Sequence, residues 1–202
     1  MRLLDCFNRH GSDKGWNHGY HDVYSRLLEP LRDQPIRLLE IGVFRGGSIA
    51  AWLDYLPNAT IIGVDTFQRV RPEEIAGLKH PRVQWFECDS TNGAPDIEPV
   101  DFIIDDGDHI QASQLATFRN FFPLLNPCGV YCIEDVLPFD AKQDPRMDTR
   151  YPENTLEGYR KLAKAISPYH VQFHDRRKGH GPGSFIIEIR PVLESPQAAG
   201  TV

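Results

Sequence analysis

Apolar strand-like runs alternate with segments of helical period along most of this chain, and this alternation constrains its fold more than any other feature. Between the runs, apolar residues recur every three or four positions, as in the stretch from Ile49 to Leu56. Such alternation is typical of a parallel sheet covered by helices. We therefore predict an α/β fold with five strand–helix units, followed by an antiparallel hairpin. The expected strands are 36–41, 60–64, 83–88, 100–104, 129–133, 171–174 and 184–189.

The length of the chain fits this fold in a single domain. With 202 residues, the chain is close to the size of one domain and well short of two. We place one domain at residues 1–190, of which residues 1–35 are expected to cover the ligand end of the sheet. The last stretch, residues 191–202, has little to bury and is expected to be a loose tail.

Charge and apolar patterning exclude several classes of partner. The formal net charge of -6 disfavours nucleic acid, whose backbone requires a basic surface. No apolar run approaches the roughly 20 residues of a membrane helix, and the first residues lack the pattern of a signal peptide. The four cysteines have no CxxC spacing and are expected to be reduced thiols. We therefore expect a cytoplasmic protein without a nucleic-acid or membrane partner, and the sequence leaves a homo-oligomer open.

A glycine-rich turn follows the first expected strand, in the sequence LLEIGVFRGGS. Glycines let the backbone approach a ligand closely, and the free amides of a helix N-terminus bind polar groups. Open α/β sheets bind ligands beyond the carboxyl ends of their strands, where this turn lies. Its spacing differs from the GxGxxG of dinucleotide binders, which disfavours a pyrophosphate ligand. The candidate binding residues are Glu40, Gly42, Gly46, Gly47 and Ser48.

Acidic residues also follow the second and third strands. Asp65 stands where a carboxylate can accept hydrogen bonds from both hydroxyls of a ribose. Asp89 and Ser90 follow the third strand, within reach of an adenine amine. Each acid alone could equally cap the helix that follows it. Together with the glycine-rich turn, they predict a site for an adenosine-bearing ligand.

Carboxylates cluster at the ends of the fourth and fifth strands, in the sequences VDFIIDDGDHI and VYCIEDV. These strands are neighbours in such sheets, and like charges so close repel one another unless a cation lies among them. Oxygen ligands suit Mg²⁺, although the sequence does not distinguish it from Mn²⁺ or Ca²⁺, and no cysteine ends either strand to favour zinc. The sequence therefore predicts a metal site among Asp105, Asp106, Asp108, Glu134 and Asp135.

His109 stands three residues after Asp106, beside the predicted metal cluster. An imidazole with a pKa near neutrality is the usual general base at physiological pH. An isolated histidine in such a position would more often be a capping or packing residue. The neighbouring acids favour the role of base.

These motifs resemble class I S-adenosylmethionine-dependent methyltransferases, which share the ExGxxxGGS turn and the acids after strands two and three. The upstream segment GSDKGWNHGYHDVYSRLLEPLR narrows the resemblance to the Mg²⁺-dependent sugar O-methyltransferases of macrolide biosynthesis, the macrocin and mycinamicin type. The resemblance implies a Rossmann-like, mostly parallel seven-stranded sheet with an antiparallel last strand and helices on both faces. It also implies S-adenosylmethionine as the cofactor.

The metal motifs carry the same resemblance, because the macrolide enzymes have DDGSH after strand four and IED after strand five. By position, this implies that Asp106, Glu134 and Asp135 hold Mg²⁺ and that His109 is the base. Asp108 replaces the serine of the family motif, and the resemblance assigns it no role.

The segment before the first strand is expected to contribute to the cofactor site. Lys14 could pair with the carboxylate of the cofactor, while Trp16, Tyr20 and Tyr24 could close over it, although helix packing explains the two tyrosines equally well. The polar stretch 139–154 is expected to shape the acceptor pocket. The cofactor-binding set is completed by Asp105, Lys14 and Tyr24.

Taken with the resemblance, these residues predict a Mg²⁺-assisted O-methyltransferase that acts on one hydroxyl of a vicinal diol. The expected acceptor is a small hydroxylated molecule, a sugar of an antibiotic-type natural product by family resemblance alone. A phenolic diol or a surface polysaccharide is an alternative acceptor. A nicotinamide-dependent oxidoreductase would use the same sheet, but the missing GxGxxG spacing counts against it.

Overall fold

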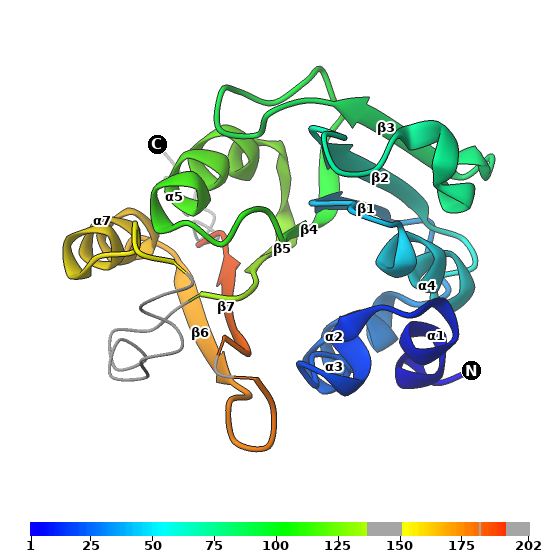
Figure 1. The fold of residues 1–202 in the computed structure, drawn as a ribbon, viewed down its shortest axis with the longest axis horizontal. Coiled ribbons are helices and arrows are strands. Elements are labelled where there is room, and N and C mark those ends of the chain that lie inside the picture. Colours follow the sequence, from blue (N-terminus) through cyan, green and yellow to red (C-terminus); the bar gives the residue numbers. More distant parts are fainter. Residues whose placement is uncertain (137–150, 182, 193–202) are drawn as a thin grey trace, which may run out of the picture.

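The computed structural model describes residues 1–136, 151–181 and 183–192, and its centre is a single seven-stranded sheet (Figure 1). Every strand expected from the sequence is present, with ends that differ by one residue, except that the fifth begins at Leu125 instead of Gly129. The strands are β1 Arg37–Ile41, β2 Thr60–Asp65, β3 Val83–Glu87, β4 Val100–Asp105, β5 Leu125–Ile133, β6 His170–Asp175 and β7 Phe185–Arg190.

The strand order is β3-β2-β1-β4-β5-β7-β6, with β1 to β5 parallel. β7 lies between β5 and β6 and is antiparallel to both, which confirms the predicted closing hairpin. After β3 the chain returns to the other side of β1, so β1 and β4 are neighbours although they are far apart in sequence. This reversal creates the crevice in which open α/β sheets bind ligands.

Helices cover both faces of the sheet, as predicted (Figure 1). Successive strand residues point to opposite faces, so Leu38 packs in one hydrophobic cluster and Leu39 in the other. The first cluster contains Trp52 of α4 and the second contains Phe118 of α5. The helices are α1 Leu3–His10, α2 Asp13–Trp16, α3 His21–Leu28, α4 Gly47–Tyr55, α5 Gln111–Phe121 and α7 Leu156–Ile166.

The prediction of five strand–helix units is wrong for two of them. The β2–β3 connection contains only short 3₁₀ turns at Pro72–Glu74 and Ala76–Lys79, and residues 88–99 between β3 and β4 contain no helix. β3 is an edge strand with three of its five residues exposed, so it leaves little apolar surface for a helix to cover. Proline and glycine in both connections also disfavour helices.

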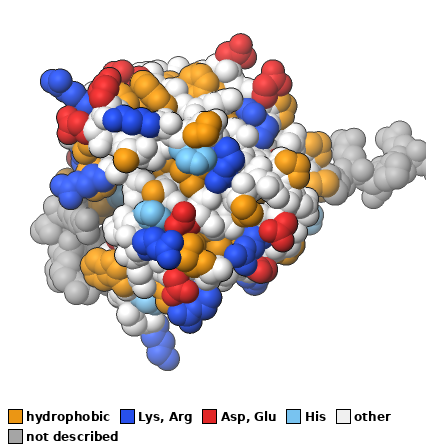
Figure 2. All heavy atoms as spheres, turned by 90° about the vertical axis from the view of Figure 1, so that its right-hand side faces the viewer, with side chains coloured by type: hydrophobic (Ala, Val, Ile, Leu, Met, Phe, Trp, Pro, Cys, Tyr) orange, Lys and Arg blue, Asp and Glu red, His pale blue; other side chains and the backbone are white. Residues whose placement is uncertain are grey.

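The described part of the chain contains no helix that could cross a membrane and no disulfide. None of the described helices has the length and apolar character needed to cross a membrane. All four cysteines are unpaired thiols. Figure 2 shows basic and acidic side chains interspersed on one face, without a broad surface of a single sign among its described atoms.

Candidate active site

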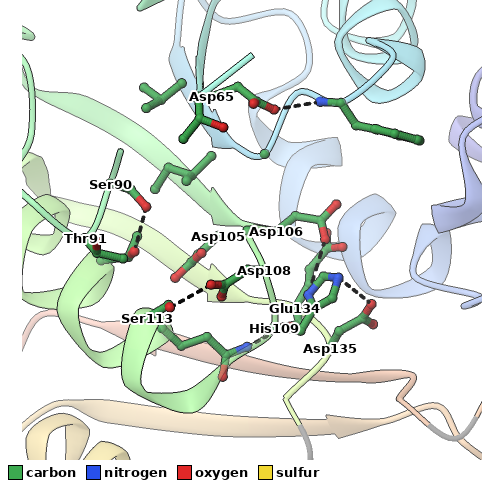
Figure 3. A pocket seen from close by; sticks show the side chains of 18 of the residues that line it. Asp65, Ser90, Thr91, Asp105, Asp106, Asp108, His109, Ser113, Glu134 and Asp135 are labelled. Atoms are coloured by element: carbon green, nitrogen blue, oxygen red, sulfur yellow. Dashed lines mark hydrogen bonds and ion pairs between the residues drawn. The ribbon is translucent and has the colours of Figure 1, made fainter. Parts of the chain in front are cut away.

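A cavity of about 840 Å³ opens at the carboxyl ends of the parallel strands (Figure 3). It reaches from Asp65 after β2, past the end of β1, to the acids after β4 and β5. The cavity therefore lies where the topology predicts a ligand site. The sequence-predicted residues that line it are Gly42, Asp65, Asp89, Ser90, Asp105, Asp106, Asp108, His109, Glu134 and Asp135.

Asp65, at the end of β2, holds the turn after β1 by hydrogen bonds to its backbone. Its Oδ2 accepts hydrogen bonds from the backbone N–H groups of Val43, at 2.8 Å, and Phe44, at 2.9 Å. Its Oδ1 accepts from the N–H of Phe67 at 2.8 Å. A carboxylate has about four lone-pair positions, so these bonds leave room for one hydroxyl of a ligand. Asp65 thus combines the structural role with a place at the cavity wall.

Asp89 is likewise engaged by its own loop. It accepts hydrogen bonds from the backbone and side chain of Thr91, at 2.9 and 2.7 Å, and from the side chain of Asn92 at 3.0 Å. The bonds from Thr91 lower the pKa of Asp89 and keep it ionised. Ser90 shares a hydrogen bond of 2.8 Å with Thr117 of α5 (Figure 3). Both residues face the same cavity as Asp65.

The glycines after β1 serve close packing. Gly42 has φ of +93°, and a Cβ there would lie 1.9 Å from the carbonyl oxygen of Asp106. A Cβ on Gly47 would lie 2.8 Å from the carbonyl oxygen of His10, so this glycine lets α1 pack on α4. Gly42 lines the cavity, whereas the predicted binding residues Gly46, Gly47 and Ser48 do not.

Glu40 lies beneath the cavity and is fully buried. Its Oε2 accepts a hydrogen bond of 3.2 Å from the indole N–H of Trp52. Burial raises the pKa of Glu40. Asp105 is also buried, accepts a hydrogen bond of 3.3 Å from the hydroxyl of Tyr131, and has its pKa raised by burial to about 8. Burial thus favours the protonated form of Asp105.

Asp106, His109 and Asp135 form the group that can hold a metal ion (Figure 3). One ligand atom from each lies within 4.8 Å of the others. The imidazole of His109 lies between the acids, with Nδ1 4.0 Å from Asp106 Oδ1 and Nε2 3.6 Å from Asp135 Oδ2. The carboxylates of Asp106 and Asp135 offer oxygen ligands of the kind that Mg²⁺ takes, so they fit the metal that the sequence predicts.

Glu134, the third predicted ligand, points its oxygens at two other side chains. Its Oε2 lies 2.7 Å from Nζ of Lys14, and its Oε1 accepts a hydrogen bond from the hydroxyl of Tyr24. Its backbone carbonyl accepts from the side chain of Gln114 at 3.1 Å. The structure thus brings two of the three predicted ligands together, and metal binding by Glu134 stays a prediction.

Lys14 is almost completely buried, with 2% of its side chain exposed. Its Nζ lies 2.5 Å from Asp106, 2.7 Å from Glu134 and 3.4 Å from Glu40. Burial alone would lower the pKa of Lys14, but the charges of the three carboxylates outweigh it and hold that pKa well above its usual value. Lys14 does not line the cavity, so its predicted contact with the cofactor carboxylate stays a prediction.

The aromatic residues near Lys14 also lie below the acids. The hydroxyl of Tyr20 donates a hydrogen bond of 2.5 Å to Asp135 Oδ1, and Tyr20 and Tyr24 are fully buried. His18, which does line the cavity, has Nδ1 3.4 Å from the same oxygen of Asp135. Sequence reasoning missed this supporting role. The signal was present, since a cluster of acids requires both a counter-ion and hydrogen-bond donors.

Asp108, to which the resemblance assigned no role, forms a turn with Ile110 just before α5. Its Oδ1 accepts from the backbone N–H of Ile110 at 3.0 Å, and its Oδ2 accepts from the hydroxyl of Ser113 at 2.7 Å (Figure 3). A serine hydroxyl can form a similar but weaker turn, which explains why serine and aspartate can replace each other in this motif.

Residues 151–154, the described end of the segment that follows the metal motif, contact His109. Residues 137–150, most of the stretch predicted to shape the acceptor pocket, lie outside the described residues. The ring of Tyr151 packs edge-on to that of His109, with 5.9 Å between centroids. The side chain of Asn154 donates to the carbonyl of His109 at 2.9 Å and accepts from the N–H of Gln111 at 2.7 Å.

Comparison with known proteins finds similarity to methyltransferases. Residues 39–136 match a family model described as a methyltransferase domain. The chain is 32% identical over 184 residues to a tetracenomycin rhamnosyl 2'-O-methyltransferase of Streptomyces olivaceus, covering 85% of this chain and 46% of that protein. It is 31% identical to the mycinamicin VI 2''-O-methyltransferase of Micromonospora griseorubida, covering 71% of this chain and 39% of that one. The chain thus spans about half the length of these relatives or less.

Solved structures show the same fold. The chain superposes on the MycE methyltransferase of the mycinamycin pathway, in complex with Mg and SAH, with a TM-score of 0.70. The identity is 24%, and the match covers all of this chain and 57% of MycE. Through residues 39–136 the chain belongs to the methyltransferase domain family, and most of its length is similar in sequence to sugar O-methyltransferases of antibiotic pathways.

Proposed function

We propose that the protein is an S-adenosylmethionine-dependent, Mg²⁺-assisted O-methyltransferase that acts on one hydroxyl of a vicinal diol. One observation carries this proposal: a single cavity joins Asp65 and Asp89 at one end to Asp106, His109 and Asp135 at the other. An adenosine site and a metal site that share one cavity can bring a methyl donor and an acceptor hydroxyl together.

At the adenosine end, Asp65 would accept a ribose hydroxyl with the lone pair that the backbone leaves free. Asp89, held ionised by its loop, would bind the adenine amine, and Ser90 would contribute to the same wall. Gly42 and Asp105 would line the cavity wall beside the cofactor. The predicted roles of Glu40, Gly46, Gly47 and Ser48 would be indirect, through the shape of the turn after β1.

At the other end, Asp106 and Asp135 would hold the metal, with Glu134 as the third predicted ligand. Bound S-adenosylmethionine supplies an electrophilic methyl group, and Mg²⁺ lowers the pKa of an acceptor hydroxyl. His109 would accept the hydroxyl proton as this oxygen bonds to the methyl carbon, the bond from sulfur to that carbon breaks, and S-adenosylhomocysteine leaves. Nδ1 of His109 is buried, which leaves Nε2 as the nitrogen to receive the proton.

The acceptor that we propose is a small neutral molecule with adjacent hydroxyls, such as the deoxysugar of a glycosylated natural product. The name of the tetracenomycin relative supports a sugar, because that protein is an O-methyltransferase of a rhamnosyl product. The many carboxylates of the cavity would repel an anionic acceptor. We further propose that residues 1–190 act as one domain and, from the unpaired cysteines, that the location is cytoplasmic.

Thermal melts with four additions test the cofactor assignment: S-adenosylhomocysteine or NAD, each with Mg²⁺ or with a chelator. A ligand at about 100 times its dissociation constant adds roughly 2.7 kcal/mol of stability, which raises the midpoint by several degrees. We expect a shift with S-adenosylhomocysteine and none with NAD. A shift with NAD alone would overturn the proposal in favour of an oxidoreductase.

An acceptor screen then tests the substrate class. Rhamnosyl glycosides with free 2- and 3-hydroxyls and a catechol are offered with S-adenosylmethionine and Mg²⁺, and products are detected by mass spectrometry. We expect methylation of the glycosides that depends on Mg²⁺. Methylation of the catechol alone would replace the sugar by a phenolic diol.

A further inference from the structure

A buried lysine lies among the acids at the ends of three adjacent strands. Lys14 Nζ is 3.4 Å from Glu40 on β1, 2.5 Å from Asp106 after β4 and 2.7 Å from Glu134 after β5. With 2% of its side chain exposed, Lys14 interacts with these carboxylates almost without water between them. Its charge therefore acts on the acid cluster with little screening.

Lys14 and the proposed metal share one carboxylate. Asp106 presents Oδ2 to Lys14, and its other oxygen, Oδ1, faces His109 within the group that fits a metal ion. A divalent ion on that group would therefore lie a few ångströms from the ammonium of Lys14. Two cations so close in a buried site repel each other strongly.

We propose that Lys14 is a resident counter-ion of the metal site. It balances the charges of Asp106 and Glu134 before a metal binds, and its repulsion lowers the affinity for the divalent ion. This inference rests on the proposed function, because it concerns the same metal site. A lysine that only positioned the ligands would have the opposite effect, since its loss would loosen them and weaken metal binding.

Calorimetric titration of the full chain with MgCl₂, without cofactor or acceptor, distinguishes these two roles. Lys14→Met removes the charge and keeps an unbranched side chain of similar length. We expect it to lower the dissociation constant for Mg²⁺ by about tenfold, because the unbalanced carboxylates then attract the ion without an opposing cation. Lys14→Arg keeps the charge and should stay within about threefold of the wild type. An unchanged or raised dissociation constant in Lys14→Met overturns the inference.

Tyr24→Phe separates charge from positioning. It removes the hydroxyl that donates to Oε1 of Glu134 and leaves the charge of the cluster unchanged. We expect an unchanged or raised dissociation constant, in contrast to Lys14→Met. Tighter binding in Tyr24→Phe equal to that of Lys14→Met would show that mobility of Glu134 explains the effect, and would overturn the role of the charge.

A second pair of variants tests the inference if Lys14→Met alone does not fold. Glu40→Gln removes one carboxylate that contacts Lys14 and is no predicted metal ligand. The double variant Lys14→Met/Glu40→Gln has the same net charge as the wild type, and circular dichroism reports whether it folds. We expect it to bind Mg²⁺ more tightly than Glu40→Gln, and equal or weaker binding overturns the inference. A wild type that binds no Mg²⁺ would instead remove the metal from the proposed function.

Discussion

The hydroxyl of Tyr20 donates a hydrogen bond to Asp135 and accepts one, at 2.9 Å, from the backbone N–H of Phe185. A single phenol thus connects the segment before the first strand to the end of β5 and the start of β7. It also fixes the carboxylate that faces His109 across the proposed metal site.

Tyr20→Phe should therefore affect both stability and metal binding. The substitution removes the hydrogen bond to the Asp135 carboxylate and one of the two acceptors of the Phe185 N–H, which also bonds the carbonyl of Gly183. A hydrogen bond to a charged group contributes about 1.5–3 kcal/mol to the free energy of unfolding. The substitution also frees Asp135, so we expect weaker binding of Mg²⁺ by calorimetry. Tyr55→Phe is the matched control, because Tyr55 is buried and donates to Glu29, away from the cavity. Equal effects of both substitutions on Mg²⁺ binding would contradict the role of Tyr20.

His109→Ala should separate binding from turnover. We expect S-adenosylhomocysteine to bind as in the wild type, while kcat falls by about 10²–10⁴, the usual contribution of a general base. His21→Ala serves as a control, because its side chain is similarly exposed (21% against 20%) but does not line the cavity. Unchanged kcat in His109→Ala with a bound acceptor would assign the proton transfer elsewhere.

Substitution of Asp108 tests whether this residue serves the helix or the reaction. Because its side chain bonds the backbone of Ile110, Asp108→Ala should cost about 1 kcal/mol of stability, whereas Asp108→Ser, which can form a similar turn, should cost less. Urea denaturation measures both. Neither change should alter the dissociation constant for Mg²⁺ by more than about threefold, and a larger effect would place Asp108 in the metal site.

The buried pair of Glu188 and His174 predicts a pH dependence far from the cavity. Burial would raise the pKa of Glu188, but bonds from His174, at 2.8 Å, and Arg190 outweigh it and lower that pKa. The folded state then binds fewer protons than the unfolded state near the usual value of 4.5. The resulting stability is complete above that pH and is lost as the pH falls through the lower folded pKa.

Glu188→Gln should consequently destabilise the protein at pH 7 by about 1–3 kcal/mol and by less as the pH falls below about 4.5. Urea denaturation of both proteins from pH 3 to 7 measures this difference. A difference that grows toward low pH would mean that the pKa is raised instead.

The strands and the gathering of the acids could be predicted from the sequence, because both depend on local patterns. The runs of Val, Ile and Leu in β1, β2 and β4 are buried on both faces, so their apolar content makes these strands recognisable in the sequence. Parallel strands place their carboxyl ends at one edge, which brings Asp65, Asp106 and Asp135 to one cavity whatever the loops do.

The partners of individual acids could not be predicted in this way. Glu134 and Asp135 are adjacent in sequence, yet one faces Lys14 and the other faces His109. Their directions depend on a segment more than 100 residues earlier, and no local pattern encodes that meeting. The missing helices around β3 have a similar cause, since an edge strand needs less cover than a central one.

The contacts of Tyr20 with Phe185 and of Lys14 with Glu134 join parts of the chain that are 165 and 120 residues apart in sequence. Contacts of such separation form late in folding, because closing a long loop costs entropy before any contact compensates for it. The acid cluster is thus complete only once the first and last segments of the fold have met. Fraying of α2 or β7 would break the contacts of Lys14 and Tyr20 with the acids of the proposed site while leaving the central strands intact. Hydrogen exchange at Tyr20 and Phe185 should therefore report on molecules with a complete site better than exchange in β1.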